Sequence, residues 1–327
     1  MQVIILTPIF EDWISFIKLV FELDEQLNKA HNLKDCKFVI LGVDDASTTE
    51  IHNKLPDWGQ LKRIRQIEMI HLAVNLGHQR AIATGLVNVA QQNADSVVVM
   101  DSDGEDLPAD AVRLISLSLD TPNKILVGQR TKRSESLSFR IGYFFYRLGF
   151  RALTGVGLPF GNFCLLPNSA INQLTYDSNI WNHFAAAINR SRFPQMKIPT
   201  ARGIRYFGTS HMNLTSLVIH GLSAMSVYSD RIAIRLIFSS IVVSLGLTIG
   251  VIAVSLIRLT SAIAIPGWAS QVVGTLGLGI FFSLGFSLLL AFITLQARQS
   301  VTFFPRIDSQ KYIRSIEVWH SNLHKNT

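Results

Sequence analysis

A dense group of carboxylates follows a short apolar run in the first half of the chain. After the apolar residues 97–100, four acidic side chains occur within six positions: Asp101, Asp103, Glu105 and Asp106. Carboxylates this close repel one another, and the repulsion raises their pKa values unless a cation offsets the charge. The spacing fits a cation-binding loop behind a buried strand. It fits equally well a solvated turn in which Pro108 begins a helix.

The elements that would position this group alternate between strands and helices. The sequence predicts strands at residues 3–9, 36–45, 67–74, 95–103 and 123–130, and helices at residues 13–30, 77–92 and 108–119. This alternation predicts an α/β fold with a mainly parallel sheet and helices on both faces. Ligands of such sheets bind beyond the carboxyl ends of the strands. Three polar clusters fall at those ends: Thr7 and Pro8 with Glu11 and Asp12, then Asp44 and Asp45, then the acidic group.

Two long uncharged stretches predict membrane spans. Charged residues make up 16% of the chain, against roughly 25% in ordinary soluble domains. The 22 residues 236–257 carry no charge, and residues 272–297 are again long and apolar. A run of about 20 apolar residues is the length that crosses a hydrocarbon core. We therefore expect two transmembrane helices, at residues 232–258 and 272–297.

The charges that flank these stretches predict their orientation. Arg231 and Arg235 precede the first span, while Arg298, Arg306 and Lys311 follow the second. Positive residues favour the cytoplasmic side. Both termini, and everything before about residue 230, are therefore expected in the cytoplasm, on an integral protein of the plasma (inner) membrane. The net charge of +7 then favours anionic lipid headgroups and phosphate-bearing substrates over nucleic acid as partners.

Two segments are predicted to lie at the membrane surface. Residues 130–151 hold six Lys or Arg and one acid, and Arg140, Arg147 and Arg151 share one helical face among aromatic residues. A basic amphipathic helix with aromatic residues suits a membrane surface, and Arg binds phosphate with two parallel hydrogen bonds. The alternative is a solvated, partly packed helix. Residues 212–231 lead into the first span and are expected to lie along the interface. The two cysteines, Cys36 and Cys164, are assigned packing roles.

The motifs taken in order resemble glycosyltransferase family 2, and most closely its polyprenyl-phosphate glycosyltransferases, the group of dolichol-phosphate mannose synthase and the bactoprenol glucosyl transferases. The matching stretches run from residue 7 to residue 211, in the family's order: TPIFED, VDDAST, NLGHQRAIATGL, DSDGEDLP, VGQR with SFRIGYFFYRL, GNFCLLP and RGIRYFGTSH. Two spans after the catalytic part also fit the bactoprenol branch. The chain departs from the family at Glu11 and Asp12, where Asn-Glu is usual, and at Glu105 for Gln, Cys164 for Arg and His211 for Lys.

The resemblance implies a GT-A-type, Rossmann-like domain that transfers a sugar, with inversion, from a UDP- or GDP-sugar to the phosphate of a polyprenyl lipid. Such a reaction belongs to cell envelope glycan biosynthesis. The diphosphate leaving group gains negative charge as the bond breaks, and a divalent cation offsets it. Mg²⁺ or Mn²⁺ prefers oxygen ligands, of which substrate phosphates supply a part. Asp101, Asp103 and Glu105 are the expected metal ligands, and Asp106 is expected to cap the following helix.

The acceptor phosphate is already an anion, so the site must offset its charge and orient it toward the sugar, and it has little need of a general base. Arg130, Arg140 and Arg205 match the family's phosphate-contacting arginines and, with Asp101 and Asp103, make up the expected catalytic set. His211 joins the arginines as a candidate for the acceptor phosphate. Pro8, Glu11 and Asp44 match positions that hold the nucleotide base and ribose, and Asp45 is a further nucleotide candidate.

The predicted organisation is a catalytic domain at residues 1–211, the interfacial helix at 212–231, the two spans and a cytoplasmic tail at 298–327. A homo-oligomer is compatible with the sequence. Two other functions remain open. One is a processive polysaccharide synthase, although such enzymes carry a Gln-x-x-Arg-Trp motif and usually more spans. The other is a catalytically silent membrane scaffold, which the acidic and arginine positions disfavour.

Overall fold

The computed structural model describes residues 1–49, 51, 55–130, 137–157, 161–208, 214–260, 267–299 and 302–322. The chain divides into two compact units. The first comprises Met1–Ser136, Pro159–Val227 and Phe303–Thr327, and the second comprises Leu137–Leu158 and Tyr228–Thr302. The first unit therefore contains residues from both ends of the chain.

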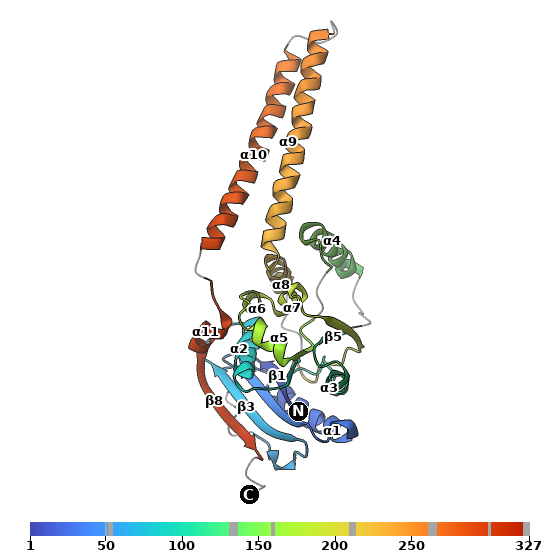
Figure 1. Ribbon diagram of the computed structural model, residues 1–327, viewed down its shortest axis with the longest axis vertical. Helices are drawn as coiled ribbons and strands as arrows, with labels where there is room; N and C mark the ends of the chain where they lie inside the picture. Colours follow the sequence, from blue (N-terminus) through green and yellow to red (C-terminus); the bar gives the residue numbers. More distant parts are fainter. Residues whose placement is uncertain are drawn as a thin grey trace. The chain divides into compact units, whose positions relative to one another are not determined.

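The described part of the first unit is built on an eight-stranded sheet in the order β7-β5-β6-β4-β1-β2-β3-β8 (Figure 1). The strands are β1 (Gln2–Ile9), β2 (Lys37–Asp44), β3 (Ile64–Leu72), β4 (Ser96–Val99), β5 (Ile125–Arg130), β6 (Cys164–Pro167), β7 (Gln195–Thr200) and β8 (Ile313–Ser321). The pairings make β6 and β8 antiparallel to their neighbours, whereas β1, β2, β3, β4, β5 and β7 run in one direction. The predicted α/β fold with a mainly parallel sheet is confirmed.

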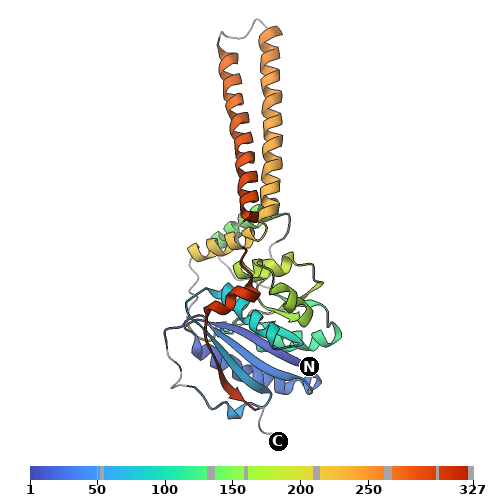
Figure 2. The same cartoon turned by 60° about the vertical axis from the view of Figure 1, so that its left-hand side comes forward.

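Helices cover both faces of this sheet (Figure 2). The helices of the first unit are α1 (Trp13–Lys29), α2 (His78–Gln91), α3 (Pro108–Asp120), α5 (Asn168–Leu174), α6 (Asn179–Asn182), α7 (Phe184–Arg190) and α8 (Leu214–Ser226), with the short elements η1 (His31–Leu33), η3 (Trp58–Gln60), α11 (Pro305–Asp308) and η4 (Ser309–Tyr312). No residue of α8 belongs to the described core of the sheet. The predicted helices at 13–30, 77–92 and 108–119 correspond closely to α1, α2 and α3.

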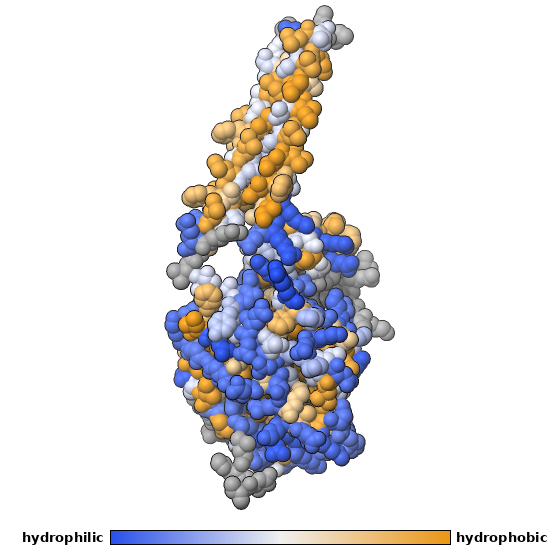
Figure 3. All heavy atoms as spheres, in the orientation of Figure 1, coloured by the Kyte–Doolittle hydropathy of each residue, from blue (hydrophilic) through white to orange (hydrophobic). Residues whose placement is uncertain are grey.

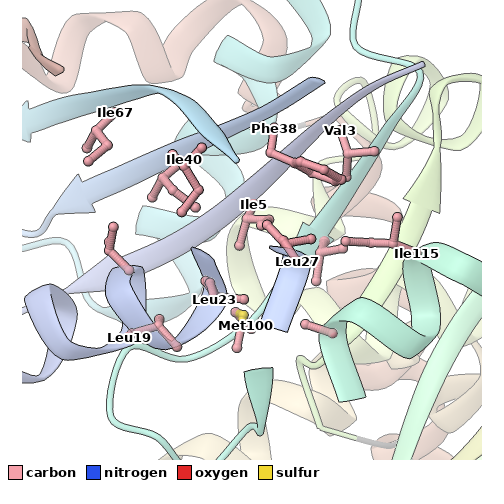
Figure 4. Close-up of a cluster of buried hydrophobic side chains, with 14 of the residues drawn as sticks. Val3, Ile5, Leu19, Leu23, Leu27, Phe38, Ile40, Ile67, Met100 and Ile115 are labelled. Carbon is pink, nitrogen blue, oxygen red and sulfur yellow. The ribbon is translucent and has the colours of Figure 1, made fainter. Parts of the chain in front are cut away.

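Alternation of side chains along the strands divides the core into two layers. Val3 and Ile5 of β1 point to the face that α1 and α3 cover, where they meet Leu19, Leu23 and Ile115 (Figure 4). Ile4 and Leu6 point to the opposite face, against α2 and the helices that follow β6. Because a strand buried on both faces is apolar throughout, β1 and β2 appear in the sequence as continuous apolar runs.

The C-terminal segment differs from its prediction. Residues 298–327 were expected to form a tail, whereas α11, η4 and β8 lie in the first unit and β8 is an edge strand of its sheet beside β3. Residues 64–72 and 313–321 pair within one sheet, so both lie on the same side of any membrane. The chain between them therefore crosses an even number of times, which agrees with two spans.

The second unit contains α4 (Leu137–Thr154) and two long helices, α9 (Ser229–Thr260) and α10 (Trp268–Gln299). The two long helices are long and apolar enough to cross a membrane. Few residues of the most apolar stretch of α9 are buried, and none of those of α10, and Figure 3 shows apolar side chains along their surface. A core helix of a soluble protein would bury these side chains. Ser283 Oγ donates to the carbonyl of Ser240, 2.9 Å away, and so links the helices.

Helix α4 packs beside the start of α9. The ring of Phe150 lies 5.9 Å from that of Tyr228, and Arg235 donates to the carbonyl of Ala152 at 2.7 Å. Beyond this contact α4 leaves large apolar side chains exposed, among them Phe144, Phe145 and Leu148. An apolar exposed face with basic neighbours is the pattern of a helix at a membrane surface.

A histidine pair, with His183 buried and His220 half-buried, joins α7 to α8. His183 Nδ1 accepts a hydrogen bond from the Ala186 N–H at the start of α7, and its ring lies 4.4 Å from that of His220 in α8. Burial, and then the neighbouring His220, lowers the pKa of His183 to about 4 from its usual 6.5. The depressed value means that the stability His183 contributes is present above pH 6.5 and is lost as pH falls toward 4.

We expect acidification from pH 7.5 to 5.5 to lower the stability of the folded chain by about 1 kcal/mol through His183. The His183→Asn variant should lack this part of the pH effect, because Asn can accept the same helix-capping bond but does not titrate. Thermal unfolding of both proteins at the two pH values measures the difference. An equal shift in both proteins would contradict the assignment.

Candidate active site

The candidate site lies at the carboxyl ends of the parallel strands. Strand β1 lies between β2 and β4, so the chain passes from β1 to β2 and β3 on one side and to β4 on the other. Ligands of open α/β sheets bind at such a switch point. Polar residues follow each strand there: Glu11 and Asp12 after β1, Asp45 after β2, the acidic group after β4 and two arginines after β7. The predicted convergence of the three polar clusters at one edge is confirmed by the strand order and directions.

Asp101 begins the acidic loop and faces α2. Its buried Oδ1 atom lies 3.3 Å from Nε2 of His78, the first residue of that helix. Burial works to raise the pKa of Asp101, but His78, Arg130 and Arg205 outweigh it and hold the pKa below its usual value. The Asp101 carboxylate is therefore favoured in its ionised form, as a metal or cation ligand must be.

Asp103 faces the segment that follows β7. Its Oδ2 atom lies 3.4 Å from Nη1 of Arg205, whose Nη2 atom lies 3.7 Å from Asp12 after β1. Arg205 therefore bridges carboxylates from two strand ends. Burial raises the pKa of Asp103, and the neighbouring Asp101 adds to the effect.

Glu105 and Asp106 are held by arginines. Arg202 donates two hydrogen bonds to the Glu105 carboxylate, from Nε at 3.1 Å and Nη2 at 2.8 Å. Arg130 donates to both acids, at 3.2 Å to Glu105 and 2.9 Å to Asp106. Both oxygens of Glu105 are thus engaged with guanidinium groups, which sets it apart from Asp101 and Asp103 among the three predicted metal ligands.

The predicted role of Asp106 as a helix cap is wrong. Helix α3 begins after Leu107 and has no side-chain cap. The Asp106 side chain instead accepts a hydrogen bond from the Asp101 N–H at 3.1 Å and pairs with Arg130. Burial, and then Asp101, raises the pKa of Asp106 to about 7. The Asp106 side chain therefore stabilises the acidic loop by linking the Asp101 backbone to Arg130.

The segment after β7 packs directly onto the acidic loop. The Gly203 N–H donates to the carbonyl of Glu105 at 2.9 Å, and the Tyr206 N–H donates to that of Asp103 at 2.8 Å. The chains approach so closely that a Cβ on Gly203 would lie 2.1 Å from the carbonyl oxygen of Gly104. This contact requires glycine at position 203, and it sets Arg202 and Arg205 against the acids.

The predicted nucleotide residues build the neighbouring loops. Glu11 has a left-handed backbone (φ 54°), and its carboxylate accepts bonds from the backbone and hydroxyl groups of Thr48 and Thr49. The Thr49 bond contributes most to lowering the pKa of Glu11 to about 2. Asp45 accepts from the N–H groups of Leu76 and Gly77, at 2.7 and 2.8 Å. These carboxylates shape the loops at which a nucleotide would bind.

The other predicted residues are placed as follows. Asp44 is buried at the end of β2 and bonds to His71, and Pro8 is buried in β1 opposite Val43. Arg140 lies in α4, within the second unit, and its side chain is outside the described part of the structure. His211 also lies outside the described residues.

Several residues of the site could not be identified from the sequence. His78 contacts Asp101, and its Nε2 atom is also 2.8 Å from Nδ2 of Asn162. Gln79 lies 3.3 Å from the same Asn162. Arg202 is a third arginine at the acidic loop. The motifs NLGHQR, GNF and RGIR contain these residues, but the spacing within a motif does not show which side chain points into the site.

The donor set allows a cation only with help from a substrate. Within the described ranges, no group of three or more His, Cys, Asp or Glu side chains is arranged to hold a metal ion. Asp101 and Asp103 nevertheless present hard oxygen atoms side by side at a strand end, which fits Mg²⁺ or Mn²⁺. Such ions are usually held by one or two carboxylates, with waters and substrate phosphates completing the shell. The three arginines beside them can bind phosphate oxygens in the same place.

Residues 22–174 match the family model for glycosyl transferase family 2. No curated protein matches the sequence of this chain. The chain is similar in structure to mannosyl-3-phosphoglycerate synthase from Rubrobacter xylanophilus, at 13% identity and a TM-score of 0.48, over 71% of this chain and 74% of that one.

It is also similar to glucosyl-3-phosphoglycerate synthase from Mycobacterium tuberculosis in complex with Mn²⁺, UDP-glucose and phosphoglyceric acid, at 14% identity and a TM-score of 0.46, over 71% of this chain and 79% of that one. At such low similarity the substrates of those enzymes are not transferred to this chain. The family match covers the acidic loop, Arg130 and most of the sheet. Residues 22–174 of this chain are therefore similar to glycosyl transferase family 2.

Proposed function

We propose that the chain transfers a sugar, with inversion, from a nucleotide-diphosphate sugar to the phosphate of a polyprenyl lipid at the cytoplasmic face of the membrane. The main observation behind the proposal is that one chain contains both a glycosyltransferase-like site and two helices able to span a membrane. Asp101 and Asp103 lie beside Arg130 and Arg205 in the unit whose residues 22–174 match the glycosyl transferase family 2 model, and a second unit supplies two exposed apolar helices. A lipid acceptor would explain why such a site is linked to membrane-spanning helices, because the acceptor itself lies in the membrane.

The residues of the chain would act by position and charge. Asp101 and Asp103 would hold Mg²⁺ or Mn²⁺, which offsets the charge that develops on the leaving diphosphate. Arg205 would exchange its present carboxylate partners for phosphate oxygens, and Arg130 would bind phosphate while it keeps its contact with Asp106. The acceptor phosphate is already anionic, so its attack on the sugar would need no general base. The loops at Glu11, Asp44 and Asp45 would hold the nucleotide.

Two helices support a lipid as the acceptor. Helix α4 exposes Phe144, Phe145 and Leu148 and packs against the start of α9. Helix α8 exposes Val218, Ile219 and Leu222 and ends only two residues before α9 begins. Both would lie at headgroup level, where a lipid phosphate is found. Helix α8 covers less of residues 212–231 than expected, because residues 229–231 belong to α9.

Incubating membranes that contain the chain with a panel of radiolabelled UDP- and GDP-sugars tests the proposal. Label should enter the organic-solvent extract with one of the donors and should be absent with membranes that lack the chain. Label that appears only in water-soluble products, for every donor, would contradict a lipid acceptor.

We expect Arg140→Ala to lower transfer at least about tenfold, equivalent to about 1.4 kcal/mol of transition-state stabilisation. Arg140 lies on the basic helix, where its guanidinium can hold two oxygens of a lipid phosphate. Arg140→Lys should recover only part of the activity, since Lys keeps the charge but loses the paired geometry. Initial rates against lipid phosphate concentration should show the defect. A loss confined to donor affinity would instead assign Arg140 to the nucleotide diphosphate.

We expect the connection between α9 and α10 to face away from the cytoplasm and the catalytic sheet to face it. In a Cys36→Ser background, Ser270→Cys at the start of α10 should react with an impermeant maleimide in intact cells. Lys311→Cys should react only after the cells are opened, because Lys311 lies in the turn before β8, which pairs with β3. The reverse pattern would place the catalytic domain away from its donor.

A further inference from the structure

The segment that returns from the apolar helices reaches the nucleotide side of the site. Strand β8 pairs with β3 in a register that sets Ser315 opposite His71 and Glu317 opposite Met69. The Ala73 N–H donates to the carbonyl of Tyr312 at 2.8 Å, which fixes the start of β8 at the carboxyl end of β3. Residues more than 240 positions apart in the chain thereby become neighbours beside β2.

His71 connects this strand to Asp44. Its Nδ1 atom lies 2.9 Å from Oδ2 of Asp44, and its Nε2 atom lies 3.6 Å from Oε2 of Glu317. The two ring nitrogens thus face one carboxylate each, and the contact with Glu317 is an ion pair when the ring is protonated. The ring is buried, with Trp13 and Trp319 about it at centroid distances of 6.4 and 6.3 Å. The position of the imidazole is thus set from both sides by carboxylates and aromatic rings.

Asp44 connects His71 to the loop at residues 45–49. Its Oδ1 atom accepts a hydrogen bond from the Ser47 N–H at 2.9 Å. Ser47 Oγ in turn accepts from the Glu11 N–H at 2.9 Å, and Glu11 binds Thr48 and Thr49. A continuous line of contacts therefore runs from Glu317 through His71 and Asp44 to the loop that follows β2 and contacts Glu11 after β1.

We propose that Glu317 is a positioning residue for the donor nucleotide, acting through His71 and Asp44 on the loop at residues 45–49. The inference rests on the proposed function, because it takes that loop as the nucleotide's binding place. It gives the C-terminal segment a role beyond anchoring the sheet edge, since the part of the chain that follows the apolar helices completes the donor site.

Glu317 has a second contact that a test must separate from the first. Its Oε2 atom also accepts a hydrogen bond from Trp319 Nε1 at 3.0 Å. Glu317→Gln keeps the size of the side chain and an oxygen for Trp319, but it removes the negative charge that faces His71. Asp308→Asn is the matched control, because Asp308 lies in the same returning segment and pairs with Lys311 instead.

The first measurement is the affinity of the purified full-length chain for UDP and for GDP, each with Mg²⁺, by calorimetry, together with donor KM and kcat. Glu317→Gln should weaken nucleotide affinity and raise donor KM about three- to tenfold while kcat stays within about twofold, as expected for one partly exposed carboxylate that faces the imidazole and acts on binding. Asp308→Asn should leave affinity, KM and kcat unchanged. An unchanged affinity in Glu317→Gln would overturn the proposal.

The second measurement separates positioning from general stability. His71→Asn keeps an N–H near Asp44, since the Asn amide can stand in for Nδ1, but it breaks the link to Glu317. Glu317→Gln should then have almost no further effect on affinity in the His71→Asn background, because coupled residues are not additive. An equal factor in both backgrounds would show that Glu317 does not act through His71 and would overturn the proposal.

These outcomes differ from a failure of the proposed function. A wild-type chain that binds neither UDP nor GDP would contradict the proposed donor, and the inference would fall with it. A wild-type chain that binds one of them while Glu317→Gln binds it equally well would leave the function in place and remove only the role of Glu317.

Discussion

Replacing Asp103 with alanine is expected to lower sugar transfer at least about 100-fold, equivalent to about 2.7 kcal/mol of transition-state stabilisation. Asp103 follows β4, two positions after Asp101, and its carboxylate lies 3.4 Å from Arg205. The substitution removes one of two carboxylates proposed to hold the cation, and it leaves Arg205 free to turn toward Asp12. Initial rates with saturating donor and acceptor measure the loss.

The matched control is Asp120→Ala, which removes an exposed carboxylate at the far end of α3 and should leave the rate unchanged. The wild-type enzyme should lose activity in excess EDTA and regain it on addition of Mg²⁺ or Mn²⁺. Full activity in excess EDTA would remove the metal from the account, whatever the result for Asp103→Ala.

The second large effect concerns stability. Arg130→Ala is expected to destabilise the folded chain by about 3 kcal/mol, the loss typical when one partner of a buried ion pair is removed. Arg130 lies 2.9 Å from Asp106, whose side chain is only 3% exposed. Without the guanidinium, a buried carboxyl group would remain beside Asp101 with no cation to offset it. Thermal unfolding in detergent measures the loss.

Rescue distinguishes this cause from a general defect. Adding Asp106→Asn to Arg130→Ala should recover part of the stability, because the amide oxygen can still accept from the Asp101 N–H and carries no charge. Arg113→Ala, which removes an exposed arginine 3.9 Å from Asp110, should cost little. A double variant no more stable than Arg130→Ala alone would show that the charge of Asp106 is not the reason.

The local pattern of the sequence was enough to predict the central part of the fold. Strands β1 and β2 are buried on both faces, so they appear as apolar runs, and α1 and α3 keep their apolar side chains at helical spacing. Each of these elements is defined by its own residues. The rule that ligands bind at strand ends then places Asp12, Asp45 and Asp101 at one edge without any knowledge of side-chain contacts.

The missed elements depend on partners that are distant in the chain. Strand β8 follows two apolar helices and pairs with β3 across more than 240 residues, so it could not be recognised as part of the sheet. Strand β6 has four residues and pairs antiparallel with β4, which lies more than 60 positions earlier in the chain. In both cases the pairing partner, and not the segment's own composition, decides the structure.

The side-chain pairings of the site could not be predicted for the same reason. Asp106 stands where a helix cap is expected, but Arg130 at the end of β5 and the Asp101 N–H are better partners for its buried carboxylate. Glu105 belongs to the motif that suggests a metal, yet Arg202 engages both of its oxygens. Which acids face a cation and which face arginines is set by how the segment after β7 packs on the acidic loop.

The most direct test of the account is transfer by the purified full-length chain to two matched acceptors, a polyprenyl phosphate and the corresponding polyprenol without phosphate. With the nucleotide-sugar that labels membranes, Mg²⁺ and either lipid, mass spectrometry identifies the product. The account predicts one sugar joined to the phosphate of the polyprenyl phosphate, with release of the nucleoside diphosphate, and no product from the polyprenol. Transfer to both lipids alike, or to neither while a soluble phosphorylated acceptor is glycosylated, would contradict it.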